Sequence, residues 1–113
     1  MRPRSRKYLR DILDAARLVT SFTTGMTYAD YESDIIIRSA VERQLTILGE
    51  AMAQLSSSDS LLAERITDYE AIIGMRIVLV HRYADLDNHR IWSTVTLSLP
   101  LLIQEISHLL AEE

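Results

Sequence analysis

An aliphatic stretch of the sequence, residues 71–80, contains one charged side chain, that of Arg76. A charge among aliphatic residues is costly unless it is paired or faces a site. At a site, an arginine presents a fork of N–H donors to an oxyanion. His81 follows this stretch directly, and a histidine exchanges protons near neutral pH. If the two residues share a site, they would suit anion binding and proton transfer.

The spacing of these residues limits how they can meet. In a continuous helix Tyr83, seven residues after Arg76, would lie on nearly the same face roughly 10 Å away, whereas His81 would lie about 140° round the axis. Arg76 and His81 therefore converge only if the helix ends near His81 or if a second copy completes the pair across a two-fold axis. A simpler interpretation is that Arg76 pairs with a core carboxylate, Glu42 or Glu50, and that His81 is a helix C-terminal residue.

The elements that must position these residues are helices. Apolar residues recur at three- and four-residue spacing, which predicts amphipathic helices over residues 5–24, with Ser5 as the N-cap, and over residues 33–55. A short helix is expected to begin at Thr27. The polar cluster at residues 56–60 is typical of a loop between helices.

The second half of the chain is expected to be helical as well. The β-branched residues of the aliphatic stretch could form a buried strand, but the flanking segments are helical and no partner strand is visible, so a helix over 69–83 is predicted. A short helix over 61–66 precedes it. The final helix, over 89–110, contains Pro100 and should kink or split near Leu99. Four main helices, one or two short ones and no sheet predict an all-α, compact antiparallel bundle.

Composition excludes several classes of protein. With 113 residues, the chain is the size of one small domain, residues 1–113. It has no cysteine, its histidines (His81, His89 and His108) lack metal-ligand spacing, and it has no glycine-rich phosphate loop. We therefore expect neither a metal nor another cofactor. No signal peptide is visible and no apolar run approaches 18 residues, so we expect a cytoplasmic protein without a membrane span.

Charge is distributed unevenly along the chain. The formal net charge is −4, yet the first ten residues hold five basic side chains and no acidic one. The remaining residues hold 7 basic and 16 acidic side chains, a net charge of −9. An acidic body does not attract nucleic acid as a whole, so any nucleic-acid binding must use a local basic patch. The five basic side chains are Arg2, Arg4, Arg6, Lys7 and Arg10.

Residues 76–83 read Arg-Ile-Val-Leu-Val-His-Arg-Tyr and fit the pattern R-x4-H-x-Y. With this motif, the sequence resembles the HepT-like branch of the HEPN superfamily. The resemblance covers nearly the whole chain and extends to further segments in the same order: Tyr8-Leu9, Asp11-Ile12-Leu13, Ile47-Leu48-Gly49-Glu50-Ala51, Ile72-Ile73-Gly74-Met75, Asp85-Leu86, Ile91-Trp92 and Ser98-Leu99-Pro100.

The resemblance implies a helical bundle that dimerises and cuts RNA. In this family Arg76 and His81 would meet across the dimer interface and form a metal-independent endoribonuclease site. The protein would be the toxin of a type II HEPN/MNT toxin–antitoxin module. Its partner would be an MNT-type nucleotidyltransferase antitoxin that silences the toxin by AMP transfer from ATP to Tyr83. Arg82 and Arg90 could extend the RNA-contacting patch.

A homodimer is the smallest assembly that we expect, with the helix over 69–83 at or near the interface. Gly74 would permit close helix approach there, or packing within one protomer. The chain departs from the family pattern at Ile77, where active HEPN nucleases usually have a polar residue, and at Arg82, where an acidic residue is common. The alternative is therefore a nuclease-inactive dimeric module that binds, and is modified by, a nucleotidyltransferase partner.

Overall fold

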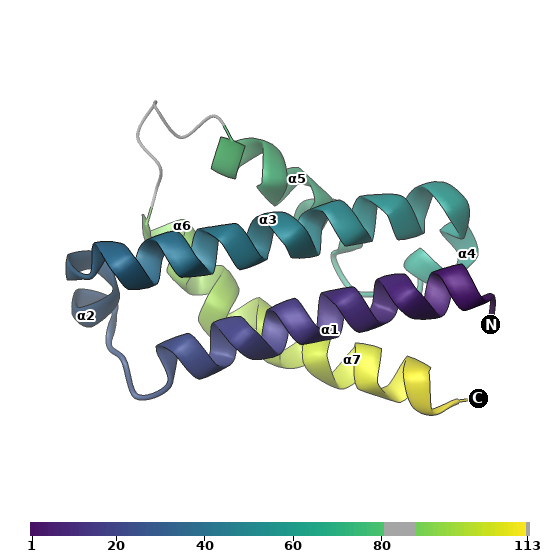
Figure 1. Ribbon diagram of the computed structural model, residues 1–113, viewed down its shortest axis with the longest axis horizontal. Helices are drawn as coiled ribbons and strands as arrows, with labels where there is room; N and C mark the ends of the chain where they lie inside the picture. The colour runs from purple at the N-terminus through teal and green to yellow at the C-terminus, as the bar shows by residue number, and fades with distance from the viewer. Residues whose placement is uncertain (81–87, 113) are drawn as a thin grey trace.

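A computed structural model describes residues 1–80 and 88–112, and every regular element in these residues is helical (Figure 1). The predicted all-α bundle is confirmed, with four main helical stretches and two short helices in the described part of the chain. The elements, in chain order, are α1 (Pro3–Thr23), α2 (Tyr28–Ser33), α3 (Ile35–Ser58), α4 (Ser60–Ala63), α5 (Tyr69–Val80), α6 (Asn88–Ser93), the π-helical turn η1 (Thr94–Ser98) and α7 (Leu99–Ala111).

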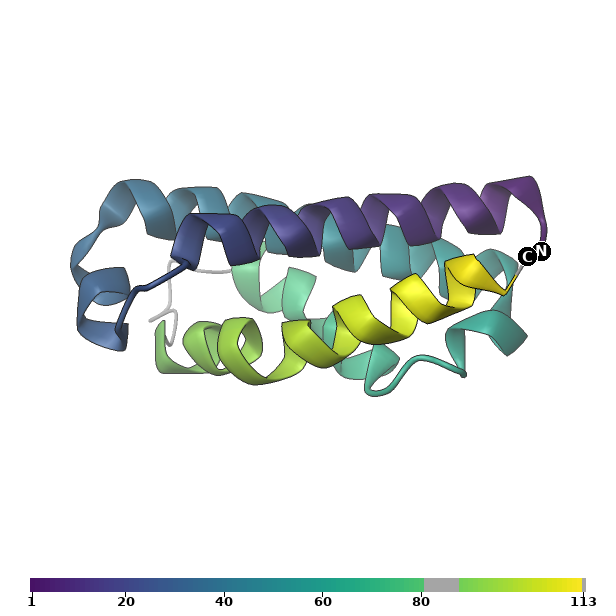
Figure 2. The same cartoon turned by 90° about the horizontal axis from the view of Figure 1, so that it is seen from below.

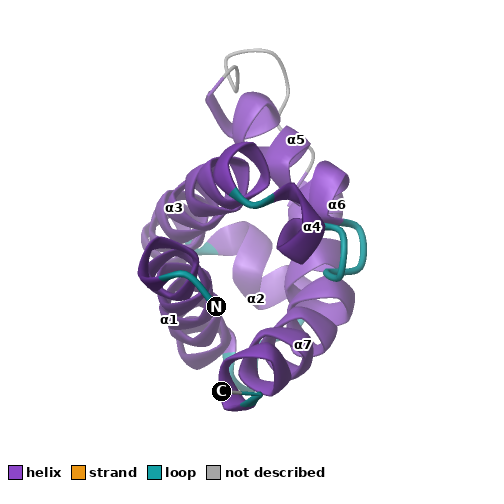
Figure 3. Cartoon of the chain, turned by 90° about the vertical axis from the view of Figure 1, so that its right-hand side faces the viewer, coloured by secondary structure: helices purple, strands orange, loops and turns teal. Residues whose placement is uncertain are grey.

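The two longest helices, α1 and α3, run antiparallel and side by side along the molecule (Figure 1). Helix α5 packs on α3, whereas α7 packs on α1. Figure 2 shows both chain termini at the same end of the bundle. The view along the bundle in Figure 3 shows α1, α3 and α7 arranged around the interior, with α5 outermost against α3.

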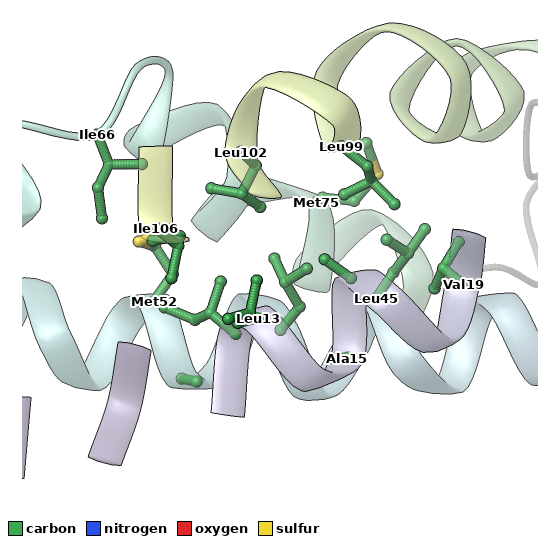
Figure 4. Close-up of a cluster of buried hydrophobic side chains, with 14 of the residues drawn as sticks. Leu13, Ala15, Val19, Leu45, Met52, Ile66, Met75, Leu99, Leu102 and Ile106 are labelled. Atoms are coloured by element: carbon green, nitrogen blue, oxygen red, sulfur yellow. The ribbon is translucent and has the colours of Figure 1, made fainter. Parts of the chain in front are cut away.

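The core fills the space between these helices (Figure 4). Helix α5 contributes Met75 and Leu79, which are both buried. Because these two residues point inward, α5 has a fixed rotation about its own axis, and this rotation sets the direction of Arg76. The other large buried side chains include Leu9, Ile12, Val19, Val41, Leu45, Met52, Leu55, Ile66, Ile91, Leu99, Leu102 and Ile106.

Local signals explain most helix boundaries. Gly25 follows α1 with a φ of 78°, the left-handed conformation that ends a helix. The Thr27 hydroxyl accepts a hydrogen bond from the Asp30 amide, and the Asp30 carboxylate accepts one from the Thr27 amide, so the expected capping box is confirmed. The Asp34 side chain accepts hydrogen bonds from two amides at the start of α3.

Two boundary predictions are wrong. Helix α1 begins at Pro3, so Ser5 is not its N-cap; Ser5 is buried, and its hydroxyl donates a 2.6 Å hydrogen bond to the Asp59 carboxylate. The serine cluster is not a loop, because α3 continues through Ser58. Asp59 then accepts a hydrogen bond from the Leu62 amide and starts α4 at once. The same carboxylate thereby ties the start of α1 to the α3–α4 corner.

The expected disruption before Pro100 is confirmed. Proline has no N–H and its ring crowds the carbonyl four residues earlier, so the α-helical ladder cannot continue unchanged. The chain adopts the π-helical turn Thr94–Ser98, in which the Leu99 amide donates to the Thr94 carbonyl. Such turns insert one residue into a helix without ending it.

The helical stretch Asn88–Ala111 is long and apolar enough to cross a membrane by length and composition alone, and no second such helix exists among the described residues. We expected no membrane span because no uninterrupted apolar run approaches 18 residues. This stretch is interrupted by polar residues, but its mean hydropathy over 18 residues reaches 1.3. Core helices meet the same criterion, and Leu99, Leu102 and Ile106 of this stretch are buried in the bundle.

Candidate functional site

Helix α5 crosses α3 at Gly49, where the two backbones approach closely. A Cβ atom at Gly49 would lie 3.1 Å from the Arg76 Cβ and 3.3 Å from the Ile72 carbonyl oxygen. Both distances are shorter than ordinary van der Waals contact, so only glycine fits here without a shift of α5. Gly49 therefore sets the distance of Arg76 from α3.

Arg76 lies at the edge of this crossing and is held by α3. Its Nη1 donates a 3.0 Å hydrogen bond to Glu50 Oε1 and forms an ion pair with it. The Arg76 side chain is 32% exposed and that of Glu50 is 53% exposed, so solvent reaches both groups. The Arg76 Nε atom is buried and has no hydrogen-bond partner among the described residues. The guanidinium is thus anchored at one nitrogen and partly open to an approaching anion.

The carboxylate that pairs with Arg76 is Glu50, one of the two expected from the sequence. The other, Glu42, lies two helical turns earlier on α3 and is 5% exposed. Glu42 is close enough to the buried Tyr31 to contribute, after burial itself, to the raised pKa of that phenol. An ion pair between exposed groups contributes at most about 1 kcal/mol, so the Arg76–Glu50 pair orients Arg76 more than it stabilises the fold.

The outer face of α5 is also apolar. Ile77, next to Arg76, is 56% exposed, and Ile73 is only partly buried. Among the described residues, a Cβ atom at Gly74 would meet nothing within 4 Å. The prediction that Gly74 permits close packing within one protomer is therefore wrong, and its place at an interface between protomers stays a prediction.

Three of the expected site residues, His81, Arg82 and Tyr83, lie outside the described residues. The structure places Arg76 before this segment and Arg90 after it, on α6. Arg90 is exposed at its position on α6, and it lines a cavity of about 170 Å³ that Met75 of α5 also lines. Of the two described arginines of the predicted set, only Arg90 lines this cavity, whereas Arg76 pairs with Glu50 of α3.

Aromatic contacts hold α6 where the chain enters it. The rings of Tyr28 and His89 stack with centroids 3.9 Å apart. The rings of Tyr31 and Trp92 lie 5.2 Å apart at a tilt of 31°. Helix α2 therefore packs on α6 through two ring pairs, which fix the position of Arg90 between them.

Gly49 is the site residue to which sequence reasoning gave no role of its own. A glycine inside a long helix costs about 1 kcal/mol relative to alanine, and such a residue usually has a packing reason. This cost was the signal in the sequence that could have identified Gly49. The reason for the glycine is a contact with another helix, α5, which the sequence of α3 does not reveal. Among the described residues, no group of three or more potential metal-ligating side chains could hold a metal ion.

Comparison with known proteins gives one consistent result. The sequence model of a family described as "Ribonuclease HepT-like" matches residues 12–109. A protein of Thermococcus cleftensis named "Probable ribonuclease HepT" is 31% identical over 102 residues, which cover 90% of this chain and 92% of that protein. "Putative RNase MJ1380" of Methanocaldococcus jannaschii is 30% identical over 101 residues, covering 88% of this chain and 90% of that protein. No solved structure matches the chain significantly.

Proposed function

Because the chain belongs to the HepT-like ribonuclease family, we propose that it is a metal-independent endoribonuclease with Arg76 and His81 as its catalytic residues. The observation that carries this proposal is the state of Arg76. Its guanidinium is fixed by Glu50 at the α3–α5 crossing and remains one-third exposed. An arginine that served only to neutralise a core carboxylate would be paired with a buried group, whereas Glu50 is half exposed.

The reaction that fits these groups uses the ribose of the RNA as the nucleophile. A base removes the proton of a 2′-hydroxyl, and the 2′-oxygen forms a bond to the adjacent phosphorus. The bond from phosphorus to the 5′-oxygen breaks, and that oxygen receives a proton. His81 would transfer these protons, and Arg76 would contact the non-bridging oxygens as negative charge develops on them. The products are a 2′,3′-cyclic phosphate and a 5′-hydroxyl.

A homodimer would complete the site. Helix α5 is apolar on its inner face, through Met75 and Leu79, and on its outer face, through Ile73 and Ile77. A helix that is apolar all round is normally covered on all sides. Pairing two copies of α5 about a two-fold axis would cover Ile77 and bring the two motif segments together.

We further propose that the protein is a cytoplasmic toxin controlled by an MNT-type nucleotidyltransferase antitoxin. The Tyr83 phenolic oxygen would attack the α-phosphorus of ATP, lose its proton and displace pyrophosphate, leaving an AMP group on the tyrosine. Tyr83 is seven residues from Arg76 in sequence, so the added phosphodiester would put a negative charge near the catalytic arginine. Arg82 and Arg90 would add positive charge to the RNA-contacting surface.

The proposal is tested by incubating mixed tRNA and mRNA with purified protein in excess EDTA, beside a His81→Ala variant. Tyr83 is first shown by mass spectrometry to be unmodified, because a modified sample would be inactive for another reason. Cleavage in EDTA by the wild type that is lost in His81→Ala supports the proposal. Absence of cleavage by an unmodified dimer contradicts it.

The exposed Ile77 favours a second candidate, a nuclease-inactive module that binds and is modified by the nucleotidyltransferase. An apolar side chain beside Arg76 offers no hydrogen bond to RNA, but it suits a protein partner. The RNA assay, together with a separate incubation with the nucleotidyltransferase and ATP, separates the two candidates. The inactive module would accept AMP on Tyr83 and form a stable complex with the partner while cutting no RNA.

A further inference from the structure

A shallow groove follows the line where α1 and α3 pack together. Tyr8 and Asp11 of α1 form one wall, and Arg43, Glu50 and Gln54 are among the residues of the other wall, from α3. We call this feature the α1–α3 groove. It passes directly beside the proposed catalytic arginine, because Glu50 in its wall is the residue that binds Arg76.

The two acidic side chains of the groove are each paired with a cation. Glu50 pairs with Arg76 at 3.0 Å, and Asp11 pairs with Lys7 at 2.8 Å. The hydrogen bond from Lys7 to Asp11 raises the pKa of the lysine, which keeps it charged. Arg43 adds a further positive charge to the wall. The lining residues Asp11, Arg43 and Glu50 and the ion-pair partners Lys7 and Arg76 together carry a net charge of +1, although the chain beyond residue 10 has a net charge of −9.

More positive charge borders the end of the groove near the N-terminus. Arg4 precedes Tyr8 by four residues on α1, so the two side chains lie on the same helix face. Arg2 donates a hydrogen bond to the carbonyl of Ser58, at the end of α3. The start of α1 has no acidic residue in its first turn, and the helix dipole adds to the positive potential there.

The cations lie on both sides of the Arg76–Glu50 pair along the groove. Ser58, beside Arg2, is eight residues beyond Glu50 on α3, which is about 12 Å at 1.5 Å per residue. Arg43 lies seven residues before Glu50, about 10 Å in the other direction. A chain of anionic groups laid along the groove would contact positive charge at both ends and pass Arg76 between them.

We propose that the α1–α3 groove binds a single-stranded segment of the RNA substrate, with phosphates on Arg4 and Arg43 and a base stacked on Tyr8. This inference rests on the proposed ribonuclease function, because that function makes RNA the substrate. Arginine forks suit phosphate oxygens, and an aromatic ring accepts any base by stacking. Since the rest of the acidic surface repels a polyanion, the groove determines which stretch of RNA can reach Arg76.

The test measures RNA binding, separately from cleavage, in a His81→Ala background. The probe is a fluorescently labelled oligouridine of about 12 nucleotides, within the range of known single-strand site sizes. The groove variant carries Arg4→Gln and Arg43→Gln. The matched control carries Arg10→Gln and Arg17→Gln, which remove the same charge from exposed positions of α1. Arg10 lies about 120° round the α1 axis from Arg4. Thermal unfolding verifies that both variants fold.

Each lost phosphate contact lowers the slope of log affinity against log salt by about 0.7 for a single strand. The groove variant should therefore lose about 1.4 in slope and about 25-fold in affinity at 0.1 M salt. The control should lose much less. Equal affinities and slopes for the two variants would overturn the proposal. The proposal would also be overturned if the groove variant bound RNA normally but no longer bound the nucleotidyltransferase, because the groove would then be a protein interface.

Failure of the groove proposal can be distinguished from failure of the proposed ribonuclease function. Cleavage by the wild type, together with a groove variant that binds like the control, would leave the ribonuclease standing without this groove. A wild type that cuts no RNA, together with a weakened groove variant, would leave an RNA-binding groove on a protein without the activity.

Discussion

Replacing Gly49 with alanine should destabilise the protein and displace Arg76. The new Cβ atom would lie 3.1 Å from the Arg76 Cβ and 3.3 Å from the Ile72 carbonyl oxygen. Overpacking of this kind costs about 1–3 kcal/mol. Alanine recovers about 1 kcal/mol through its higher helix propensity. The net effect should be a loss of about 0–2 kcal/mol, with α5 moved by a few tenths of an ångström away from α3.

Gly74→Ala is the matched control on the partner helix. A Cβ atom there meets no atom of the described part of the chain within 4 Å, so this variant should gain the full helix propensity, about 1 kcal/mol. The two variants should therefore differ by about 1–3 kcal/mol in the free energy of unfolding, measured in urea. Unfolding at two protein concentrations separates the stability of the protomer from that of a dimer.

RNA cleavage provides the second measurement on Gly49→Ala. Since small misplacements of a catalytic group lower rates strongly, cleavage should fall by about 10-fold or more, whereas binding of the oligouridine should change little. Equal stabilisation by Gly49→Ala and Gly74→Ala at low protein concentration would refute the claim that the α3–α5 crossing requires glycine at position 49.

Three further variants test stability and assembly. Ser5→Ala should cost about 1–2 kcal/mol, because it removes a hydrogen bond to a carboxylate. That bond lowers the pKa of Asp59, so its contribution to stability is present above the ordinary carboxyl pKa and is lost as pH falls through the lowered value. In urea unfolding below about pH 4, the stability of Ser5→Ala should therefore fall less with decreasing pH than that of the wild type. Burial raises the pKa of Tyr31, so the wild type should lose stability above about pH 10, and thermal unfolding should show a smaller loss in Tyr31→Phe. The Tyr31 hydroxyl has no hydrogen-bond partner among the described residues, so Tyr31→Phe should be at least as stable at pH 7; a clear loss would mean that the hydroxyl is bonded. Ile77→Glu should leave the protomer folded and weaken a dimer at least 10-fold in sedimentation, and an unchanged dimer would place the interface elsewhere.

The helices and the broken final helix could be predicted because their causes are local. Three- and four-residue periodicity marks an inward stripe whatever the neighbours are, and Pro100 disturbs a helix by its own covalent structure. The end of α3 was predicted wrongly because it depends on a contact with another helix. Serine is common in loops, but Ser58 extends α3 because Asp59 provides the next cap and the corner packs on α1 through Ser5.

The sequence could narrow the partner of Arg76 to two carboxylates but could not decide between them. The sequence indicates that a charge in an aliphatic helix needs a partner, and it offers Glu42 and Glu50 on the neighbouring helix. Which of them meets Arg76 depends on where α5 crosses α3, and spacing within one helix contains no information about that crossing. Gly49 favours Glu50, because the missing side chain lets α5 approach α3 closely beside that residue.

The measurement that tests the central claim most directly uses an RNA oligonucleotide cut by the wild-type protein, with the cleaved position mapped. The same oligonucleotide is then made with a single 2′-deoxyribose on the 5′ side of the cut and incubated with unmodified protein in EDTA. We predict that this substrate is not cut at that position, and that the all-ribose product ends in a 2′,3′-cyclic phosphate. Arg76→Ala should cut the all-ribose substrate about 100-fold or more slowly. Continued cleavage beside the deoxyribose, leaving a 5′-phosphate, would contradict the account.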